Sequence, residues 1–167
     1  MSRLFPLLLL LLAPATGCKE EPPVRAPTPP TNEAQPSPKK ATQKASVRFG
    51  NDADTTVYVE VVRSSAAISR GLMYREHMAD DAGMLFLMPE ERVQSFWMKN
   101  TFIPLDIIFI RADLTVAGIV ENAEPQTLTS RTVGKPSKYV LEVNAGWSQR
   151  HGVKTGSKAT FVDVALP

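Results

Sequence analysis

The sequence predicts an α+β domain of mostly β structure, in which short strands curl into a partial barrel beside two short helices. Hydrophobic residues make up 43% of the 167-residue chain, too large a share for a wholly disordered protein. From residue 47 onward they occur in short runs separated by Gly, Pro, Asn and Asp, which is typical of many short strands. Only two stretches carry residues that cap or end a helix, and both are short.

The strand pattern is clearest near the start of the domain. Val57, Val59 and Val61 alternate with Tyr58 and Glu60, which predicts a strand with one buried face. The same reasoning, with breaks at turn residues, predicts strands at residues 47–49, 57–62, 84–88, 95–99, 105–110, 115–120, 139–144 and 158–164.

Helix and loop signals complete the pattern. A helix at Ala66–Arg70 is expected to begin at a serine cap and to end at Gly71, and a single helical turn at Ser148–His151 is expected to end at Gly152. Pro89 is expected to stop the strand before it. Residues 121–138 form a long connection, and a loop of that length inside a compact domain is often functional.

Residues 1–17 have the features of a signal peptide. Arg3 is a short positive region, and Leu4–Ala13 is an apolar run. As a helix this run would rise about 15 Å, half of a ~30 Å hydrocarbon core, so it is not a stable membrane span. Cys18 follows small residues in an arrangement that resembles the lipobox of bacterial lipoproteins, which implies cleavage before Cys18 and lipidation of its thiol. The alternative is ordinary cleavage after Ala15, which would leave a free thiol.

Residues 18–46 are expected to be a disordered Pro-rich tether. This segment holds seven of the 14 prolines and has no Leu, Ile, Phe, Tyr or Trp, so it cannot bury enough apolar surface to offset ordering entropy. Lys19, rather than Asp, follows Cys18, which under the lipoprotein resemblance indicates the outer membrane. The expected location is therefore the bacterial cell envelope, with the lipid on Cys18 as the membrane anchor and the domain, residues 47–167, facing the periplasm.

Charge and cysteine content exclude several classes of function. The chain has a formal net charge of +2, but residues 47–167 carry 13 Lys+Arg and 14 Asp+Glu, a net −1, which gives no electrostatic case for a nucleic-acid partner. The single Cys excludes an intramolecular disulfide framework, and the two His residues argue against a His-rich metal centre. Since there is neither a phosphate-binding glycine loop nor an EF-hand spacing, we expect no cofactor and no metal.

The sharpest candidate site lies at residues 97–101. Trp97 and Lys99 point to one side of the expected strand, next to Asn100, and an aromatic ring beside an ammonium and an amide suits a small polar molecule or sugar. The alternative is that Trp97 packs in the core while Asn100 builds the following turn.

Carboxylates and amides elsewhere in the domain are further candidates. Asp106 stands in an otherwise apolar strand, where it would be either an acid, base or ligand anchor, or a carboxylate that accepts backbone N–H groups from the turn at residues 100–103. Glu121 and Asn122 end one strand, and Glu142 and Asn144 share one face of another. If they converge on Asp106, paired carboxylates would permit glycoside hydrolysis; solvated strand ends are the alternative.

Five motifs appear in order along the domain: Arg70-Gly71-Leu72-Met73-Tyr74-Arg75-Glu76, Gly83-Met84-Leu85-Phe86, Ser95-Phe96-Trp97-Met98-Lys99-Asn100-Thr101, Pro104-Leu105-Asp106-Ile107-Ile108-Phe109-Ile110 and Tyr139-Val140-Leu141-Glu142-Val143-Asn144-Ala145-Gly146. Together they resemble the domain of unknown function family 192, also called uncharacterised protein family 0127. The resemblance covers residues 57–164. It implies a small, mostly β, α+β domain, often found behind a signal peptide, and it implies no established activity.

Three functions remain open. The first, which we favour, is an envelope-anchored binding module for a small polar or carbohydrate ligand, held by Trp97, Lys99, Asn100 and Asp106 with Glu121, Asn122 and Asn144 as further candidates. The second is a hydrolase that uses Asp106 with Glu121 or Glu142. The third is a structural or accessory lipoprotein without a small-molecule site. The sequence shows no nucleophile–base pair, which argues against an enzyme.

Overall fold

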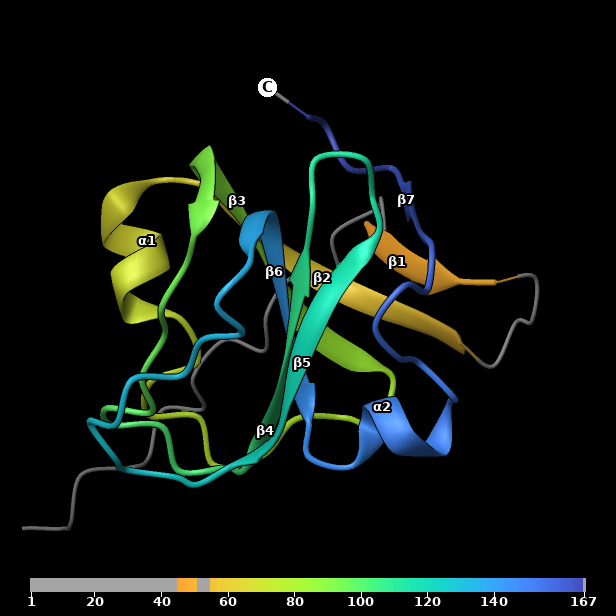
Figure 1. Ribbon diagram of the computed structural model, residues 1–167. Coiled ribbons are helices and arrows are strands. Elements are labelled where there is room, and N and C mark those ends of the chain that lie inside the picture. Colours follow the sequence, from red (N-terminus) through yellow and green to blue (C-terminus); the bar gives the residue numbers. More distant parts are fainter. Residues whose placement is uncertain (1–44, 51–54, 167) are drawn as a thin grey trace, which may run out of the picture. The chain divides into compact units, whose positions relative to one another are not determined.

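Seven strands form one sheet in the order β5-β4-β6-β3-β2-β1-β7 (Figure 1). The structure is a computed structural model that describes residues 45–50 and 55–166. The strands are β1 (Ser46–Phe49), β2 (Thr56–Val62), β3 (Ala82–Val93), β4 (Leu105–Ile110), β5 (Val116–Ala123), β6 (Pro136–Asn144) and β7 (Ala159–Val162). The helices are α1 (Ser65–Arg70) and α2 (Trp147–Arg150). The predicted signal peptide, Cys18 and the tether as far as residue 44 lie outside the described residues.

Helix α1 lies in the connection between β2 and β3, which pair in parallel, whereas the other strand pairs are antiparallel. Parallel neighbours need such a crossover connection. The Ala67 N–H donates to Ser64 Oγ at 3.3 Å, and Gly71 ends the helix with a φ of 47°, which confirms the predicted cap and stop. In the described part of the chain, no helix is long and apolar enough to cross a bilayer.

The sheet curls until its two edge strands meet at one end. Thr115, just before β5, pairs with Lys158, just before β7. The Val116 N–H donates to the Ser157 carbonyl at 2.9 Å, and the Gly156 N–H donates to the Val116 carbonyl at 2.9 Å. These contacts confirm the predicted mostly β domain with short strands in a partial barrel.

The curled sheet buries side chains on both faces. The inner core, inside the curl, is formed chiefly by Val47, Phe49, Val57, Leu85, Leu87, Ile108, Ile110, Leu141, Val143 and Trp147. The outer core, between the other face, α1 and the long loops, is formed chiefly by Leu72, Met84, Phe86, Met98, Ile107, Phe109 and Val140. Neighbours such as Ile107 and Ile108 fall in different cores because successive side chains of a strand point to opposite faces.

Three of the structural predictions are wrong. β3 continues through Pro89, because its pairing with β6 is irregular between Leu87 and Arg92 and a proline there need not donate to the ladder. Residues 95–99 are not a strand but an irregular segment with one bridge, Phe96 to Arg131. The long connection is also shorter than expected, since β5 and β6 extend into it and leave residues 124–135.

Candidate ligand-binding site

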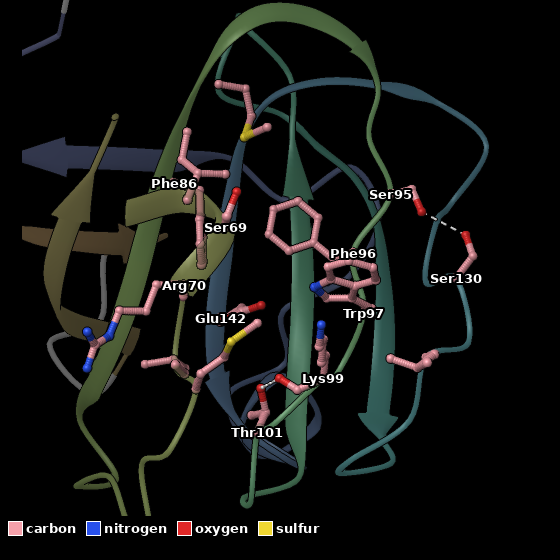
Figure 2. A pocket seen from close by; sticks show the side chains of 16 residues that line it. Ser69, Arg70, Phe86, Ser95, Phe96, Trp97, Lys99, Thr101, Ser130 and Glu142 are labelled. Atoms are coloured by element: carbon pink, nitrogen blue, oxygen red, sulfur yellow. Dashed lines mark hydrogen bonds between the residues drawn. The ribbon is translucent and has the colours of Figure 1, made fainter. Parts of the chain in front are cut away.

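A cavity of about 390 Å³ lies on the outer face of the sheet, a volume typical of small-molecule sites (Figure 2). It opens between the end of α1 and two irregular segments, residues 94–104 and 124–135. It is lined by Ile68, Ser69, Arg70, Gly71, Leu72, Met73, Phe86, Met88, Ser95, Phe96, Trp97, Lys99, Thr101, Leu128, Ser130 and Glu142. Its walls are largely apolar, with hydroxyls and three ionisable side chains among them.

Glu142 is the acidic side chain of the cavity. It lies in β6, where its backbone neighbours are Met84 in β3 and Ile107 in β4, and it is only 4% exposed. Among the described residues, none donates a hydrogen bond to its carboxyl group or forms an ion pair with it. Burial raises the pKa of Glu142 from its ordinary value of 4.5 to about 8, because the charged form loses its hydration. At neutral pH the group is therefore a carboxylic acid that can donate one hydrogen bond and accept others.

Trp97 and Lys99 lie on the opposite wall from α1. Trp97 is 50% exposed, whereas Met98 between them is fully buried in the outer core, as the alternation predicts. Lys99 Nζ lies 5.6 Å from the centroid of the Trp97 ring, within the range of a cation–π contact. Figure 2 shows the Lys99 ammonium, the Trp97 ring and the Glu142 carboxyl in the central part of the cavity view.

Backbone hydrogen bonds hold the two irregular segments together. The Arg131 N–H donates to the Phe96 carbonyl at 2.7 Å, and the Phe96 N–H donates to the Arg131 carbonyl at 2.9 Å. The Met98 N–H donates to the Thr127 carbonyl at 3.0 Å. The Phe96 ring packs edge-on against Phe86, with 5.0 Å between centroids. Trp97 and Lys99 therefore extend from a backbone that is fixed on both sides.

The mouth of the cavity is tied to the segment after α1. The Tyr74 N–H donates to the Asn100 carbonyl at 2.8 Å, and Asn100 Nδ2 donates to the Tyr74 hydroxyl at 2.8 Å. Asn100 has a φ of 53°, a conformation that asparagine tolerates better than most residues. The structure thus places Asn100 beside the cavity as a turn residue, which is the alternative that the sequence left open.

Asp106 lies away from the cavity. Its Oδ1 accepts the N–H groups of Asn122 and Gly146, both at 3.0 Å, and its Oδ2 accepts the N–H of Ser148 at 2.9 Å. The carboxylate thus accepts backbone N–H groups, as one of the two hypotheses predicted. The prediction that residues 100–103 supply these donors is wrong. The donors come from the end of β5 and the start of α2, since Asp106 points to the inner face of the sheet.

The remaining candidates do not converge on Asp106 as a group. Asn122 contributes its backbone N–H to Asp106, while Glu121 is exposed near the end of β5. Asn144 Nδ2 donates to the carbonyls of Met78 and Ala79, at 3.0 and 3.1 Å, and so fastens the chain before β3. Trp97 and Lys99 are thus the candidates that the structure brings together in the cavity.

Glu142 and Asp106 lie on opposite faces of the sheet. In the register of β4 and β6, Glu142 is opposite Ile107 of the outer core, and Asp106 is opposite Val143 of the inner core. The geometry therefore does not form the Asp106–Glu142 pair that hydrolysis would use. Sequence reasoning placed Glu142 only as a partner of Asp106 and missed its central place in the cavity. The available signal was a lone carboxylate in the apolar strand Tyr139–Asn144, the same signal that singled out Asp106.

Sequence reasoning also missed the wall opposite Trp97. The end of α1 and Gly71–Met73 contribute to the cavity. Residues 70–73 belong to the first of the five family motifs, but that motif indicated no chemical role. Over the described ranges 45–50 and 55–166, no cluster of three or more His, Cys, Asp or Glu residues could hold a metal ion.

The fold and the site define the class of protein: a small α+β domain with a curled sheet and a cavity on the outer face of that sheet. The chain belongs to the DUF192 family, described as uncharacterized ACR, whose family model matches residues 47–161. This confirms the resemblance inferred from the five motifs.

The chain is similar to several solved chains, among them the following two. One is a proposed transcription regulator from Sinorhizobium meliloti, 40% identical, covering 71% of this chain and 94% of that chain with a TM-score of 0.66. The other is a protein of unknown function from Novosphingobium aromaticivorans, 37% identical, covering 70% of this chain and 83% of that chain with a TM-score of 0.64. No curated protein matches the chain.

Proposed function

We propose that the domain binds a small, hydroxyl-bearing ligand of carbohydrate size in the cavity on the outer face of the sheet. The observation that carries the proposal is Glu142, a buried carboxyl group without a hydrogen-bond partner among the described residues that lines a cavity of about 390 Å³. A buried polar group that lacks a protein partner is costly unless something else satisfies it. A ligand with hydroxyl groups supplies both donors and acceptors to a protonated carboxyl.

The cavity also has an apolar wall of the kind that sugars use. A pyranose presents C–H groups on its faces and hydroxyls at its edges, and the half-exposed Trp97 ring can pack against such a face. Hydroxyls of Ser95 and Ser130, which hydrogen-bond to each other at 2.7 Å, and of Thr101 stand along the same walls. This division into one ring and several polar groups is common in small-molecule sites.

Binding is favoured over hydrolysis by the arrangement of acids. Glycoside hydrolysis uses two carboxyl groups about 5–10 Å apart on either side of the reacting bond. Glu142 is the one acidic residue among those that line the cavity, and Asp106 lies on the other face of the sheet with both oxygens bonded. The domain therefore presents a recognition site rather than a pair of catalytic acids.

We also propose that the domain is anchored in the bacterial envelope by a lipid on Cys18 and faces the periplasm. The apolar run at Leu4–Ala13, the position of Cys18 and the Pro-rich tether support this proposal. The Sinorhizobium meliloti relative is described as a proposed transcription regulator, but the net charge of −1 over residues 47–167 does not favour a nucleic-acid partner for this chain.

The test uses glucose and two pyranoses that each differ from it in one group: glucuronate, with a carboxylate at C6, and glucosamine, with an amine at C2. Each is titrated into the isotope-labelled full-length chain in detergent, and amide chemical shifts are followed. We expect at least one sugar to give saturable shifts around Glu142 and Trp97, weakened about tenfold or more in Trp97→Ala. Tyr58→Ala removes an exposed aromatic side chain outside the cavity and serves as the matched control. Absence of saturable shifts with all three sugars would contradict the proposed function.

A further inference from the structure

We infer that the ligand carries an anionic group, such as the carboxylate of a sugar acid, which binds between the Lys99 ammonium and the carboxyl group of Glu142. This inference deepens the proposed function and rests on it, because it assigns the charge of the ligand in the same cavity. Two observations support it: the ionisable side chains that line the cavity, and the absence of a described hydrogen-bond partner for Glu142.

The cavity lining carries positive charge at neutral pH. Arg70 and Lys99 are its cationic residues, and Glu142 is its acidic one. Neither cation forms an ion pair with a described residue; the ion pairs found there are Arg75–Glu60 and Lys158–Asp113. Arg70 stands at the rim, with its guanidinium turned away from the centre of the cavity in Figure 2, so Lys99 is the cation directed to the interior.

Glu142 does not cancel this charge below about pH 8. In the sheet its neighbours Met84 and Ile107 are apolar, so β3 and β4 present no charge to it. α1 contributes Arg70, and residues 95–101 contribute Lys99, but neither comes within the 4.0 Å of an ion pair. The loop at residues 124–135 contributes only uncharged side chains to the lining. Desolvation therefore keeps the carboxyl group protonated, with a pKa of about 8.

A protonated carboxyl and an ammonium are both hydrogen-bond donors. Two donors in one cavity fit an acceptor, and a carboxylate is the acceptor that forms the strongest bonds with both. A cationic ligand would instead meet Lys99 as a like charge and would first have to ionise Glu142. The hydroxyl-bearing remainder of the ligand then lies along Trp97 and the serine and threonine hydroxyls.

The experiment compares glucuronate, glucose and glucosamine, which share a ring and differ in charge. The full-length chain is titrated with each at several pH values between 6 and 9. We expect glucuronate to bind at least about tenfold more tightly than glucose at pH 6.5, the size expected for a charge-assisted hydrogen bond. Its affinity should be level up to about pH 7.5 and should fall toward tenfold per pH unit above 8, where Glu142 loses its proton.

Two variants separate the contributions. Glu142→Gln keeps a donor of similar shape but cannot ionise, so the fall in glucuronate affinity between pH 7 and 9 should disappear. Lys99→Met keeps the aliphatic stem beside Trp97 but removes the charge, so the preference for glucuronate over glucose should shrink to about threefold or less. Thermal unfolding of both variants is measured to check that they fold, and Lys99, being exposed, is the safer position to substitute.

The outcomes are distinguishable. Equal affinity for glucose and glucuronate overturns the inferred charge but leaves the proposed function standing. Preference for glucosamine over glucose at pH 6.5, where the sugar amine is protonated, also overturns it, because a cationic ligand would then be bound beside Glu142. If the pH dependence of glucuronate affinity is the same in Glu142→Gln as in the wild type, the inference is overturned, because the anion then does not bind at Glu142. If none of the three sugars binds, the proposed function itself fails.

Discussion

Two buried carboxyl groups of this domain have opposite surroundings, and each has a separate consequence for stability. Asp106 is fully buried and accepts three backbone N–H groups at 2.9–3.0 Å. Glu142 is almost as buried and accepts none from the described residues. Both residues interrupt apolar strands in the sequence, so the sequence alone could not tell which of them is satisfied by the fold. The difference comes from the chain at Gly146 and Ser148, whose N–H groups reach Asp106 on the inner face, whereas no donor from the described residues reaches Glu142 on the outer face.

Asp106→Asn is expected to lower the free energy of unfolding by about 1–3 kcal/mol, because an amide oxygen replaces only one of the two accepting oxygens and the NH₂ group faces a backbone donor. Urea unfolding of the wild type and the variant measures the change. The affinity for the sugars should stay within about twofold, since Asp106 does not line the cavity. A loss of binding in a folded Asp106→Asn variant would contradict the structural role assigned to this residue.

Glu142 is expected to make the domain less stable as pH rises. Its pKa is 4.5 in the unfolded chain and about 8 in the folded one, so between these values the folded state holds a proton that the unfolded state lacks. Unfolding therefore becomes easier with rising pH across this window, by at most about 1.4 kcal/mol per pH unit, and the effect is complete above pH 8. Burial of the unpaired charged form is the physical cause.

The measurement is the difference in unfolding free energy between Glu142→Gln and the wild type from pH 4 to pH 9. This difference should grow in favour of the variant from about pH 4.5 to about pH 8 and then level off. Glu121→Gln, at an exposed position near the end of β5, is the control and should show little pH-dependent difference. A flat difference for Glu142→Gln would mean that its carboxyl group is not desolvated as described.

At the scale of elements, the sequence predicted the strands that alternate and the helices that are capped. It failed where tertiary contacts decide the outcome. Residues 95–99 alternate well enough to resemble a strand, but a strand needs a continuous partner, and the neighbouring segment offers Phe96 only one bridge, to Arg131. Pro89 is a strong local stop signal, yet β3 continues because Arg92 and Val93 regain pairing with the start of β6.

The same limit explains the outcome for the candidate site. Trp97 and Lys99 could be paired from their spacing within one segment. Their position opposite α1 and above β6 depends on a crossover and on two loops that hydrogen-bond to each other, and no local pattern encodes those contacts. The sequence therefore predicts which side chains of one segment lie together, but not which segments meet to form the site.

The segment before β3, residues 75–81, has no regular structure and is fastened by Asn144. Asn144→Ala is expected to leave the carbonyls of Met78 and Ala79 without this donor, costing about 0.5–2 kcal/mol, and to speed amide exchange in residues 75–81. Hydrogen-exchange mass spectrometry makes the measurement. Asn122→Gly is the matched control, because Asn122 has a φ of 50° that glycine adopts freely and its bond to Asp106 comes from the backbone. Unchanged exchange in Asn144→Ala would show that this contact does not hold the segment.

At the scale of the whole molecule, the proposed lipid anchor on Cys18 is open to a direct test. Cys18→Ala removes the thiol that lipidation requires, so the variant is expected to remain an uncleaved precursor or to move from the membrane to the soluble fraction. Detergent partitioning and the apparent mass of the product in bacterial cells are the two readouts. Cys18→Ser is a second variant of nearly equal size. Partitioning of both variants as in the wild type would contradict the lipoprotein assignment.

The order of the strands also bears on how the domain matures. β1 lies between β2 and β7, with Val47 paired to Phe161, so a strand made early in synthesis is completed by one made late. Until the chain beyond Ala159 has emerged, the edge of β1 that later pairs with β7 has unpaired N–H and carbonyl groups. Such an edge can pair with other polypeptides. A product truncated before β7 therefore exposes an aggregation-prone strand edge that β7 covers in the folded domain. We therefore expect chaperones and proteases to recognise a product that lacks β7 by the exposed edge of its β1 strand.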